Sequence, residues 1–510
     1  MIRFGAFVLL TGITALATQI SSFSSSSEQT PVTFNKDVVP ILQRNCQACH
    51  RPGEVAPMSF RTYENVRPWA KAIKAAVVSK KMPPWFADPR YGGFRNAPTL
   101  TQEEINVLSA WVDSGAREGN TEDRAQPIEW VDGWRIQPDV IVSMPEPYRV
   151  KAKGNGEIKE FLVPNPFKED TWVSSIEIRP GDPAVVHHVI VQVPEQPVER
   201  GFAWGALNCG RCSMLPSVIG GLQQAVLRTP DQNQDDRRPN RRGPYSSGAV
   251  ERMKEVGTFT TMEAVYAPGA PPLDFRFHNS AKLIRAGRQI RIEVHYTPNG
   301  KETTDQTMIG FTLAKAPAQR RFVIMAPTSL ADTRKPIPAG ASNWETGGEL
   351  TFTQDAELVW FMPHMHLRGK DMTFRLVYPN GLTDTVLSSK FDFQWQLGYE
   401  VEEPIRVPKG TKMLVTAHYD NSANNARNPD PSRDVSWGEL TSQEMMLPWF
   451  GVVVKEGADP EMIAAYRPAT SEGDSPTVAP VPRLRLPTPP FVGGVTRPGV
   501  LTPIWLPHAK

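Results

Sequence analysis

The sequence contains one group of residues whose types and spacing suit covalent haem attachment. Cys46 and Cys49 are separated by two residues, and His50 follows directly. In this spacing two thiols bond the vinyl groups of a haem, and the adjacent histidine binds the iron. A redox dithiol and a zinc site are the alternatives, but zinc requires further cysteine or histidine ligands, and none lies close in the sequence. The motif therefore predicts one covalent haem c.

A thioether is expected as the second axial ligand, and two methionines follow the motif. Met82 precedes two prolines, which stiffen the loop that would present the sulfur, and Trp85 comes next as a cover for the haem. Met58 lies close to His50 in the sequence, so packing alone can explain why a methionine occurs at this position. We predict Met82 as the ligand, with the alternative that it fills a gap in the core, as methionine often does.

Three histidines in the middle of the chain occur where strands are predicted. His187 and His188 are adjacent, so both can reach one ion only if the strand ends or bulges there, which the preceding Gly181-Asp182-Pro183 permits. His295 follows an alternating run whose aliphatic residues form the other face, so it is expected to point to solvent or a cleft. A lone strand histidine is usually structural, and each of these signals alone is weak.

A second set of metal-binding residue types lies later in the chain. His364 and His366 are two residues apart and therefore share one face of a strand. Glu444 is followed by Met445 and Met446, which offer a soft thioether. A doubled methionine is more often core filler, so the order of these residues carries more weight than any one of them.

The elements expected to position these residues divide the chain into segments. Thr101 with Glu104 forms a capping box, and residues 63–78 have helical apolar spacing, whereas the chain from about residue 140 alternates like antiparallel strands. We predict a small all-α domain followed by two tandem antiparallel β-sandwich (jelly-roll) domains. The expected boundaries are a signal peptide at 1–17, the helical domain at 31–119, the two sandwiches at 136–317 and 318–456, and a proline-rich extended tail at 457–510.

Composition narrows the cellular setting and the partners. Lysine plus arginine number 56 against 54 aspartate plus glutamate, so nothing suggests nucleic-acid binding. Arg3 precedes an apolar run that ends in Ala15-Leu16-Ala17, which is typical of a signal peptide and too short to span a membrane. We expect a periplasmic or secreted protein that is not membrane-spanning.

Two resemblances follow from these motifs. Residues 38–115 resemble a cytochrome c domain, in which the methionine before Pro-Pro is the axial ligand. Over residues 140–455 the order His-His, strand histidine, His-x-His and Glu-Met resembles the copper type II, ascorbate-dependent monooxygenases, the family of the peptidylglycine alpha-hydroxylating and dopamine beta-monooxygenases. That family holds two coppers on facing domains across a solvent-filled cleft.

The resemblance implies two copper sites in this chain. The electron-supplying copper would be held by His187, His188 and His295. The oxygen-binding copper, where the C–H bond is broken, would be held by His364, His366 and Met445. Met445 is preferred over Met446 because the family's ligand directly follows an acidic residue.

The sequence departs from the peptide-hydroxylating members at the substrate site. Met362 stands where those members have an arginine, and Leu447 replaces an asparagine, so together with Trp360 and Trp449 they indicate a fairly apolar small molecule. The family's disulfides are largely missing, and Cys209 with Cys212 is expected to form a short-loop disulfide.

These observations predict an extracytoplasmic haem c-containing dicopper monooxygenase that hydroxylates a C–H bond with O2. An external electron donor would reduce the haem, which would supply the coppers in place of ascorbate. The alternative is a periplasmic electron-transfer or copper-binding protein without monooxygenase activity. A third possibility is related chemistry that uses peroxide.

Overall fold

The computed structural model describes residues 31–193 and 262–467, apart from residues 99, 130–132, 155, 326, 328–330 and 439. The predicted signal peptide, the Cys209–Cys212 disulfide and nearly all of the proline-rich tail lie outside the described residues. Within them, no helix is both long and apolar enough to cross a membrane.

Most helices of the described chain lie between residues 34 and 123. They are η1 (Phe34–Val38), α1 (Val39–Asn45), α2 (Tyr63–Val66), η2 (Arg67–Trp69), α3 (Ala70–Val78), α4 (Gln102–Asp113) and η3 (Thr121–Asp123). Two later turns of helix are η7 (Phe275–His278) and η8 (Pro460–Met462). The predicted capping box at the start of α4 is confirmed, because Thr101 and Glu104 exchange both hydrogen bonds. The helices bury a small apolar core around Phe34, Leu42, Leu108 and Trp111.

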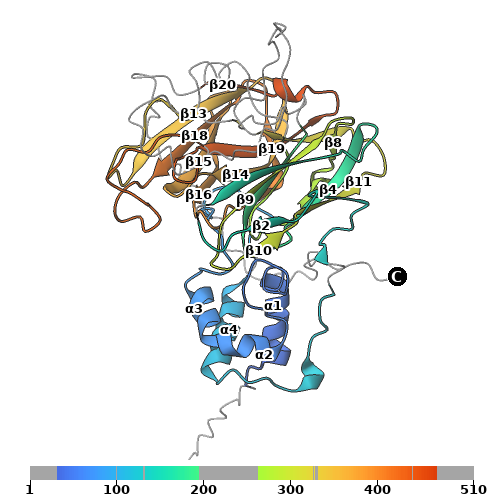
Figure 1. The fold of residues 1–510 in the computed structure, drawn as a ribbon, viewed down its shortest axis with the longest axis vertical. Helices are drawn as coiled ribbons and strands as arrows, with labels where there is room; N and C mark the ends of the chain where they lie inside the picture. The colour runs from blue at the N-terminus through green and yellow to red at the C-terminus, as the bar shows by residue number, and fades with distance from the viewer. Residues whose placement is uncertain are drawn as a thin grey trace, which may run out of the picture. The chain divides into compact units, whose positions relative to one another are not determined.

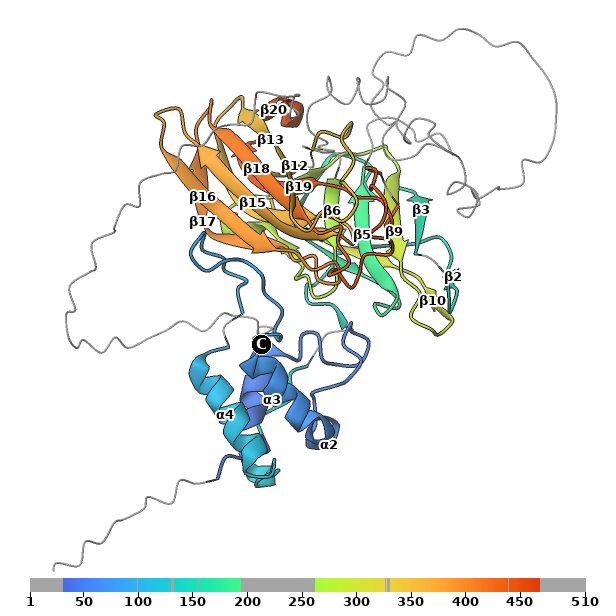
Figure 2. The same cartoon turned by 90° about the vertical axis from the view of Figure 1, so that its left-hand side faces the viewer.

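The strands form four larger antiparallel sheets and one small pair, β10 (Thr303–Asp305) with β2 (Tyr148–Val150). Sheet 1 has the order β1 (Val140–Ser143), β11 (Met308–Leu313), β4 (Thr171–Arg179), β7 (Leu273–Asp274), with β8 (Lys282–Ile284) also on β4. Sheet 2 has the order β3 (Glu157–Val163), β9 (Ile290–Tyr296), β5 (Val186–Gln192), β6 (Met262–Tyr266). Strands β9, β5 and β6 run side by side in Figure 2.

Sheets 3 and 4 come from the later part of the chain. Sheet 3 has the order β12 (Arg320–Met325), β19 (Leu447–Lys455), β14 (Ala356–His364), β17 (Tyr399–Val407). Sheet 4 has the order β16 (Thr383–Lys390), β15 (Gly369–Val377), β18 (Lys412–Tyr419), β13 (Trp344–Phe352), β20 (Ala464–Arg467). The strands of sheet 4 are the orange group that contains β13, β15 and β18 in Figure 1.

Sheet 3 is buried on both faces and belongs to two cores at once. Along β12, Phe322 and Ile324 pack into the core shared with sheets 1 and 2, whereas Val323 and Met325 pack into the core shared with sheet 4. Successive strand residues point to opposite faces, so this alternation places apolar side chains on both sides of the sheet. Sheet 3 thus joins the earlier and later sheets through continuous cores.

The segment between α3 and α4 also leaves the helical core and pairs with the sheets. Residues 86–88 exchange backbone hydrogen bonds with β16, and residues 93–95 do the same with β17. Trp85 packs edge-on against Tyr399 with ring centroids 5.0 Å apart, so one part of this partly buried ring contacts the core of sheets 3 and 4.

The predicted fold class, a small all-α cytochrome c domain followed by two tandem antiparallel β-sandwich domains, is therefore wrong. The described chain is mostly β, its longest helix has only 12 residues, and the described residues from 31 to 467 all belong to one compact unit. Two features are the physical reason. The segment between α3 and α4 pairs with β16 and β17, and sheet 3 is shared between two cores.

Candidate functional site

A β-bulge on β5 brings the adjacent His187 and His188 to the same place. The pairing of β5 with β9 shifts register between Val186 and His188, which confirms the bulge expected from the sequence. The two Nδ1 atoms lie 3.0 Å apart. Two nitrogen ligands about 2 Å from one metal ion and at right angles to each other are also separated by about 3 Å. The bulge therefore creates a spacing that suits two ligands of one ion.

His295 lies on β9 directly opposite His188. The two strand positions are paired, and their rings stack with centroids 3.6 Å apart. The face of β9 that carries His295 does not meet solvent as predicted, because Arg291 and Glu293 on the same face are 0% and 5% exposed and form an ion pair. His295 is thus held inside the protein, in contact with the first histidine pair.

His364 ends β14, and His366 follows two residues later. Their ring centroids are 5.4 Å apart, as expected for an i, i+2 pair. The centroid of His364 also lies 5.3 Å from that of His188. The two predicted ligand sets are therefore in direct contact through these rings and not on opposite sides of an open cleft. We call His187, His188, His295, His364 and His366 the histidine cluster.

Four rings of the histidine cluster each donate one N–H to a fixed acceptor. His187 Nε2 lies 2.7 Å from the Phe393 carbonyl, and His295 Nε2 lies 2.7 Å from the Glu293 carboxyl. His364 Nδ1 lies 2.6 Å from Gln396 Oε1, and His366 Nδ1 lies 3.1 Å from the Gln443 carbonyl. Because a carbonyl or carboxyl oxygen accepts, the proton of a neutral ring sits on the bonded nitrogen. In His295 and His364 the other nitrogen then carries a free lone pair, as in metal-binding histidines, whereas His187 Nδ1 accepts a hydrogen bond from His188 Nδ1.

His418 shows what a structural histidine looks like in the same chain. Its Nδ1 lies 2.6 Å from Asp371 and its Nε2 lies 3.1 Å from Glu345, so both ring nitrogens are engaged by carboxyl groups. Neither nitrogen has a lone pair available for a metal. The prediction that His418 is structural agrees with these contacts.

Burial keeps four rings of the histidine cluster neutral, those of His187, His188, His364 and His366. Burial, with a smaller contribution from neighbouring histidines, lowers the pKa of His187 and of His366 to about 4. The same two causes lower the pKa of His188 and of His364 well below the usual value. Lone pairs are therefore available at neutral pH, because a charged imidazolium cannot bind a metal.

The donor set fits copper, although the rings are not yet arranged around one point. No three histidine, cysteine, aspartate or glutamate side chains of the described residues already form a group that could hold a metal ion. His295 stacks on His188 with an angle of 30° between the ring planes, so the two rings lie face to face. Nε2 of His188 is buried without a hydrogen-bond partner in the described structure, which is costly unless a rotated ring or a ligand satisfies it. Imidazoles with a nearby thioether suit copper.

Met445 and Met446 lie in different surroundings. Met445 is only partly buried and packs against the core that contains Met362 and Trp449. Met446 is completely buried in the core of sheets 3 and 4, on the other face. Trp449 in turn stacks on His364 with ring centroids 4.9 Å apart. Met445 therefore shares its core with residues beside the histidine cluster, which agrees with the choice of Met445 over Met446.

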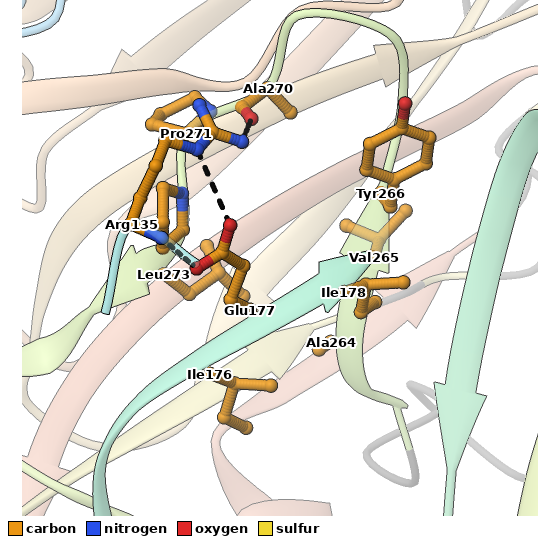
Figure 3. A pocket seen from close by; sticks show the side chains of 11 residues that line it. Arg135, Ile176, Glu177, Ile178, Ala264, Val265, Tyr266, Ala270, Pro271 and Leu273 are labelled. Carbon is orange, nitrogen blue, oxygen red and sulfur yellow. Dashed lines mark hydrogen bonds and ion pairs between the residues drawn. The ribbon is translucent and has the colours of Figure 1, made fainter. Parts of the chain in front are cut away.

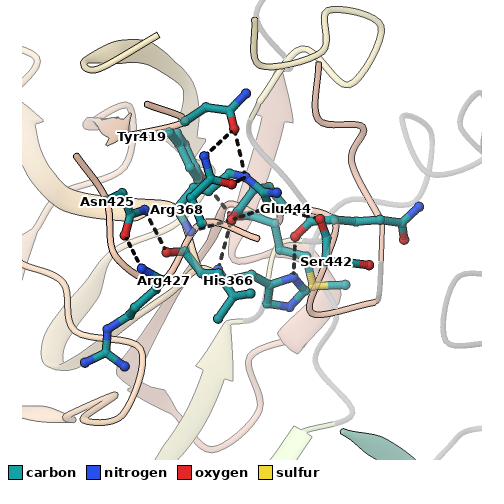
Figure 4. A network of polar contacts seen from close by, with 12 residues as sticks. His366, Arg368, Tyr419, Asn425, Arg427, Ser442 and Glu444 are labelled. Atoms are coloured by element: carbon teal, nitrogen blue, oxygen red, sulfur yellow. Dashed lines mark hydrogen bonds and ion pairs between the residues drawn. The ribbon is translucent and has the colours of Figure 1, made fainter. Parts of the chain in front are cut away.

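Glu444, which directly precedes Met445, is hydrogen-bonded to the backbone of the segment that follows His364. Its carboxyl oxygens accept hydrogen bonds from the backbone N–H of His366 at 3.0 Å and of Arg368 at 2.7 Å, and the Arg368 side chain reaches the Ser442 carbonyl (Figure 4). Burial raises the pKa of Glu444 to about 8, although these bonds act in the opposite direction. The network fixes His366 relative to Met445. The sequence did not reveal the part played by Arg368.

The predicted substrate-contacting side chains are packed and not exposed. Trp360, Met362 and Trp449 are 5%, 2% and 1% exposed. All three belong to one apolar core, and Trp449 stacks on His364, so this face of the ring is covered.

Cys46, Cys49 and His50 lie on one turn that follows α1. The backbone N–H groups of Cys49 and His50 both bond to the Cys46 carbonyl, and both cysteines are free thiols. His50 Nδ1 lies 3.2 Å from the Met58 carbonyl, and its ring stacks on Phe60, which leaves Nε2 with a lone pair. Burial raises the pKa of Cys46 to about 12, unlike a redox dithiol, which needs a lowered thiol pKa. This arrangement fits haem attachment.

The two candidate axial methionines differ in packing. Met58 packs against the helical core beside Cys46, whereas Met82 is half-buried in a loop whose N–H bonds to the Ala76 carbonyl. Met58 thus takes part in the packing of the helical core, and Met82 stays the predicted ligand.

A pocket that the sequence did not predict lies between sheet 1 and the end of β6. Glu177 accepts hydrogen bonds from the Arg135 backbone N–H at 2.7 Å, and the Arg135 guanidinium donates to the Ala270 carbonyl at 2.8 Å (Figure 3). The charge of Arg135 lowers the pKa of Cys49, against the larger effect of burial. One residue of the pocket, Arg135, therefore lies close enough to the haem attachment turn for its charge to act on Cys49.

Phe393 and Gln396 are the site residues that sequence reasoning missed. Each holds a histidine of the cluster, yet Phe393 is 206 residues from His187 in the chain. They belong to a loop without a hydrophobic period or a motif, so nothing in the local sequence identifies them.

Comparison with known proteins adds no assignment. No protein-family model matches the chain, and no curated protein is significantly similar to it. A solved structure of infectious bursal disease virus, Gt strain, is 8% identical with a TM-score of 0.14, over 66% of this chain and 76% of that chain. A TM-score this low carries no argument about fold or function.

Proposed function

We propose that this protein is an extracytoplasmic, copper-dependent monooxygenase with one covalent haem c, and that it hydroxylates a C–H bond of a small, fairly apolar molecule with O2. One copper would be held by His187, His188 and His295. The other copper would be held by His364, His366 and Met445. The haem would be bonded to Cys46 and Cys49, with His50 and Met82 as iron ligands.

One observation carries the proposal: His295 and His364 each have one nitrogen fixed by an acceptor and the other left with a lone pair, and in the hydrogen-bonded pair of His187 and His188 a lone pair remains on His188 Nε2. Metal-binding histidines show this arrangement because the fixed nitrogen sets the tautomer and the ring orientation. Purely structural histidines tend to use both nitrogens, as His418 does here. The order of the ligand types along the chain, which resembles the copper monooxygenases, supports the same conclusion.

Copper and haem, when bound, would supply one-electron redox chemistry and reactivity toward O2. The protein's own contribution is to fix the rings and to keep water away. Gln396 holds His364 in one tautomer, and Glu444 holds the backbone of His366 beside the segment that leads to Met445. Trp449 covers one face of His364.

The electron requirement explains why both parts occur in one chain. Insertion of one oxygen atom from O2 into a C–H bond consumes two electrons and two protons and releases one water. A haem accepts and gives one electron at a time. We propose that an external donor reduces the haem twice per hydroxylation, in place of ascorbate.

The proposal is tested by a substrate screen on copper-loaded, reduced protein, with O2 consumption and product formation as readouts. Wild type and His418→Ala are expected to turn over an apolar substrate, and His364→Ala is expected to be inactive. His418→Ala is the matched control because it removes a histidine that has no free nitrogen. Copper uptake and haem reduction without O2-dependent product from any substrate would favour the alternative, an electron-transfer or copper-binding protein.

A further inference from the structure

One short loop between β16 and β17 contacts both ligand sets of the histidine cluster. This is residues 392–396, which we call the 392–396 segment. The Phe393 carbonyl accepts from His187 Nε2 at 2.7 Å, and the Phe393 ring stacks on His187 with centroids 4.2 Å apart. Gln396 accepts from His364 Nδ1 at 2.6 Å and donates weakly to the Phe393 carbonyl at 3.4 Å. The segment is therefore bonded to one histidine of each predicted copper site.

The same segment reaches the haem attachment turn through Trp395. Gly269, in the turn between β6 and β7, has φ +82°, and its α-carbon faces both groups. A Cβ at this position would lie 3.3 Å from the Trp395 indole and 3.9 Å from Cys49 Sγ. The indole and the sulfur therefore both lie near this one point. Glycine is required here both by the backbone conformation and by this close approach.

We infer that Trp395 is the electron-transfer residue that connects the haem to the histidine cluster, an inference that rests on the proposed function. The connection runs from the Cys49 sulfur, which would be part of the haem thioether, to the indole of Trp395. From Trp395 it continues through one peptide bond to Gln396 and across its hydrogen bond to His364, and through the backbone to Phe393 and His187. The half-buried indole bridges the one gap in this connection that is neither a covalent bond nor a hydrogen bond.

The electron balance of the step is simple. For each electron, haem iron is oxidised from Fe(II) to Fe(III), and one copper is reduced from Cu(II) to Cu(I). No bond forms or breaks and no group leaves. Every proton can stay in place, because the N–H groups of His187 and His364 point to their acceptors before and after transfer. The reductant of the haem is an external one-electron donor, for which ascorbate or dithionite serves in the test.

The other interpretation is that the segment only supports the fold. Trp395 donates its backbone N–H to the Asp392 carbonyl, as in an ordinary turn, and this bond does not depend on the side chain. If Trp395 has only a structural role, its effect depends on the volume that its side chain fills. If it transfers electrons, its effect depends on the aromatic ring. Substitution by leucine and by phenylalanine separates the two roles.

The experiment measures reoxidation of the haem in full-length protein loaded with haem and Cu(II). The haem is reduced rapidly under anaerobic conditions, and its optical spectrum is followed by stopped flow without substrate or O2. The variants are Trp395→Leu, Trp395→Phe and, as matched control, Gln394→Leu, which changes an exposed side chain of the same segment. Copper content and the haem midpoint potential are measured for each protein.

In wild type the reoxidation rate should not depend on protein concentration, because the transfer is intramolecular. Trp395→Leu should slow it at least about tenfold, equivalent to about 1.4 kcal/mol in the activation free energy. Trp395→Phe and Gln394→Leu should stay within about threefold of wild type, with unchanged copper content and haem potential.

Reoxidation of Trp395→Leu at the wild-type rate would overturn the inference and leave the proposed function intact. Loss of copper or haem in Trp395→Leu would also overturn it, in favour of a structural role. A wild-type protein that takes up no haem or no copper would contradict the proposed function itself.

Discussion

Replacement of Gln396 by leucine should weaken copper binding at His364 while the fold persists. Gln396 is 2% exposed, and its Oε1 is the acceptor that fixes the proton of His364 on Nδ1. Leucine has a similar size but accepts no hydrogen bond. The ring then either leaves a buried N–H unpaired or moves its proton to Nε2, where it occupies the lone pair intended for the metal.

The magnitude follows from these two outcomes. A buried donor without a partner costs about 1–3 kcal/mol of unfolding free energy. Loss of the hydrogen-bonding partner of a metal-binding histidine lowers metal affinity about 10–100-fold. This corresponds to about 1.4–2.7 kcal/mol of binding free energy. The other copper should be little affected, because His187 keeps its own bond to the Phe393 carbonyl.

The assay is competition for Cu(I) against a coloured chelator, combined with urea unfolding of the metal-free protein. Gln396→Glu keeps an acceptor at this position and should retain most of the affinity. Gln394→Leu changes an exposed neighbour and should behave as wild type in both measurements. If Gln396→Leu is destabilised but binds both copper ions with wild-type affinity, the argument that the fixed nitrogens prepare the rings for metal is refuted.

Three further expectations concern the cofactors and the pH response. The haem should resist extraction with acidified acetone, and Met82→Ala should turn its low-spin ferric spectrum high-spin, whereas Met58→Ala should not; the reverse result would move the axial role to Met58. Dialysed protein should take up two coppers per chain, of which His187→Ala and His364→Ala each lose one, while His418→Ala keeps both; loss of both coppers from a single substitution would indicate one shared site. The metal-free protein should lose stability as the pH falls from about 6.5 toward 4, because burial lowers the pKa of His187 to about 4 and the unfolded chain therefore binds more protons in that range; a flat profile by urea unfolding would contradict this.

The local features of the site could be predicted from the sequence. Adjacent histidines can reach one ion only if the strand ends or bulges, and β5 has a bulge between Val186 and His188. The i, i+2 spacing placed His364 and His366 within contact distance. These predictions succeeded because backbone geometry alone determines them.

The predicted fold class failed because it depended on which faces of the sheets are covered. The alternation along β12 places Val323 and Met325 in one core and Phe322 and Ile324 in another, but a sequence of apolar residues does not say what lies on each side. Similarly, nothing in the run after Met82 indicates that it would leave the helices and pair with β16 and β17.

The contacts that join the two ligand sets were also beyond local reasoning. His295 was expected to point to solvent or a cleft because its strand face is polar, yet Arg291 and Glu293 neutralise each other inside the protein. Phe393 and Gln396 act through a carbonyl and an amide oxygen, groups that many residues of any sequence could supply. Such partners become visible only when distant parts of the chain are brought together.

The central claim is that the histidine cluster with Met445 transfers oxygen from O2 to an organic substrate. It is tested most directly by incorporation of ¹⁸O from ¹⁸O2 into product by copper-loaded protein whose haem has been reduced. Leucine keeps the volume and apolarity of methionine but removes its soft donor. Wild type and Met446→Leu should form labelled product, and Met445→Leu should form none while its haem still reduces and its fold remains. A labelled product from Met445→Leu at the wild-type rate, or product from wild type that carries no label, would contradict the account.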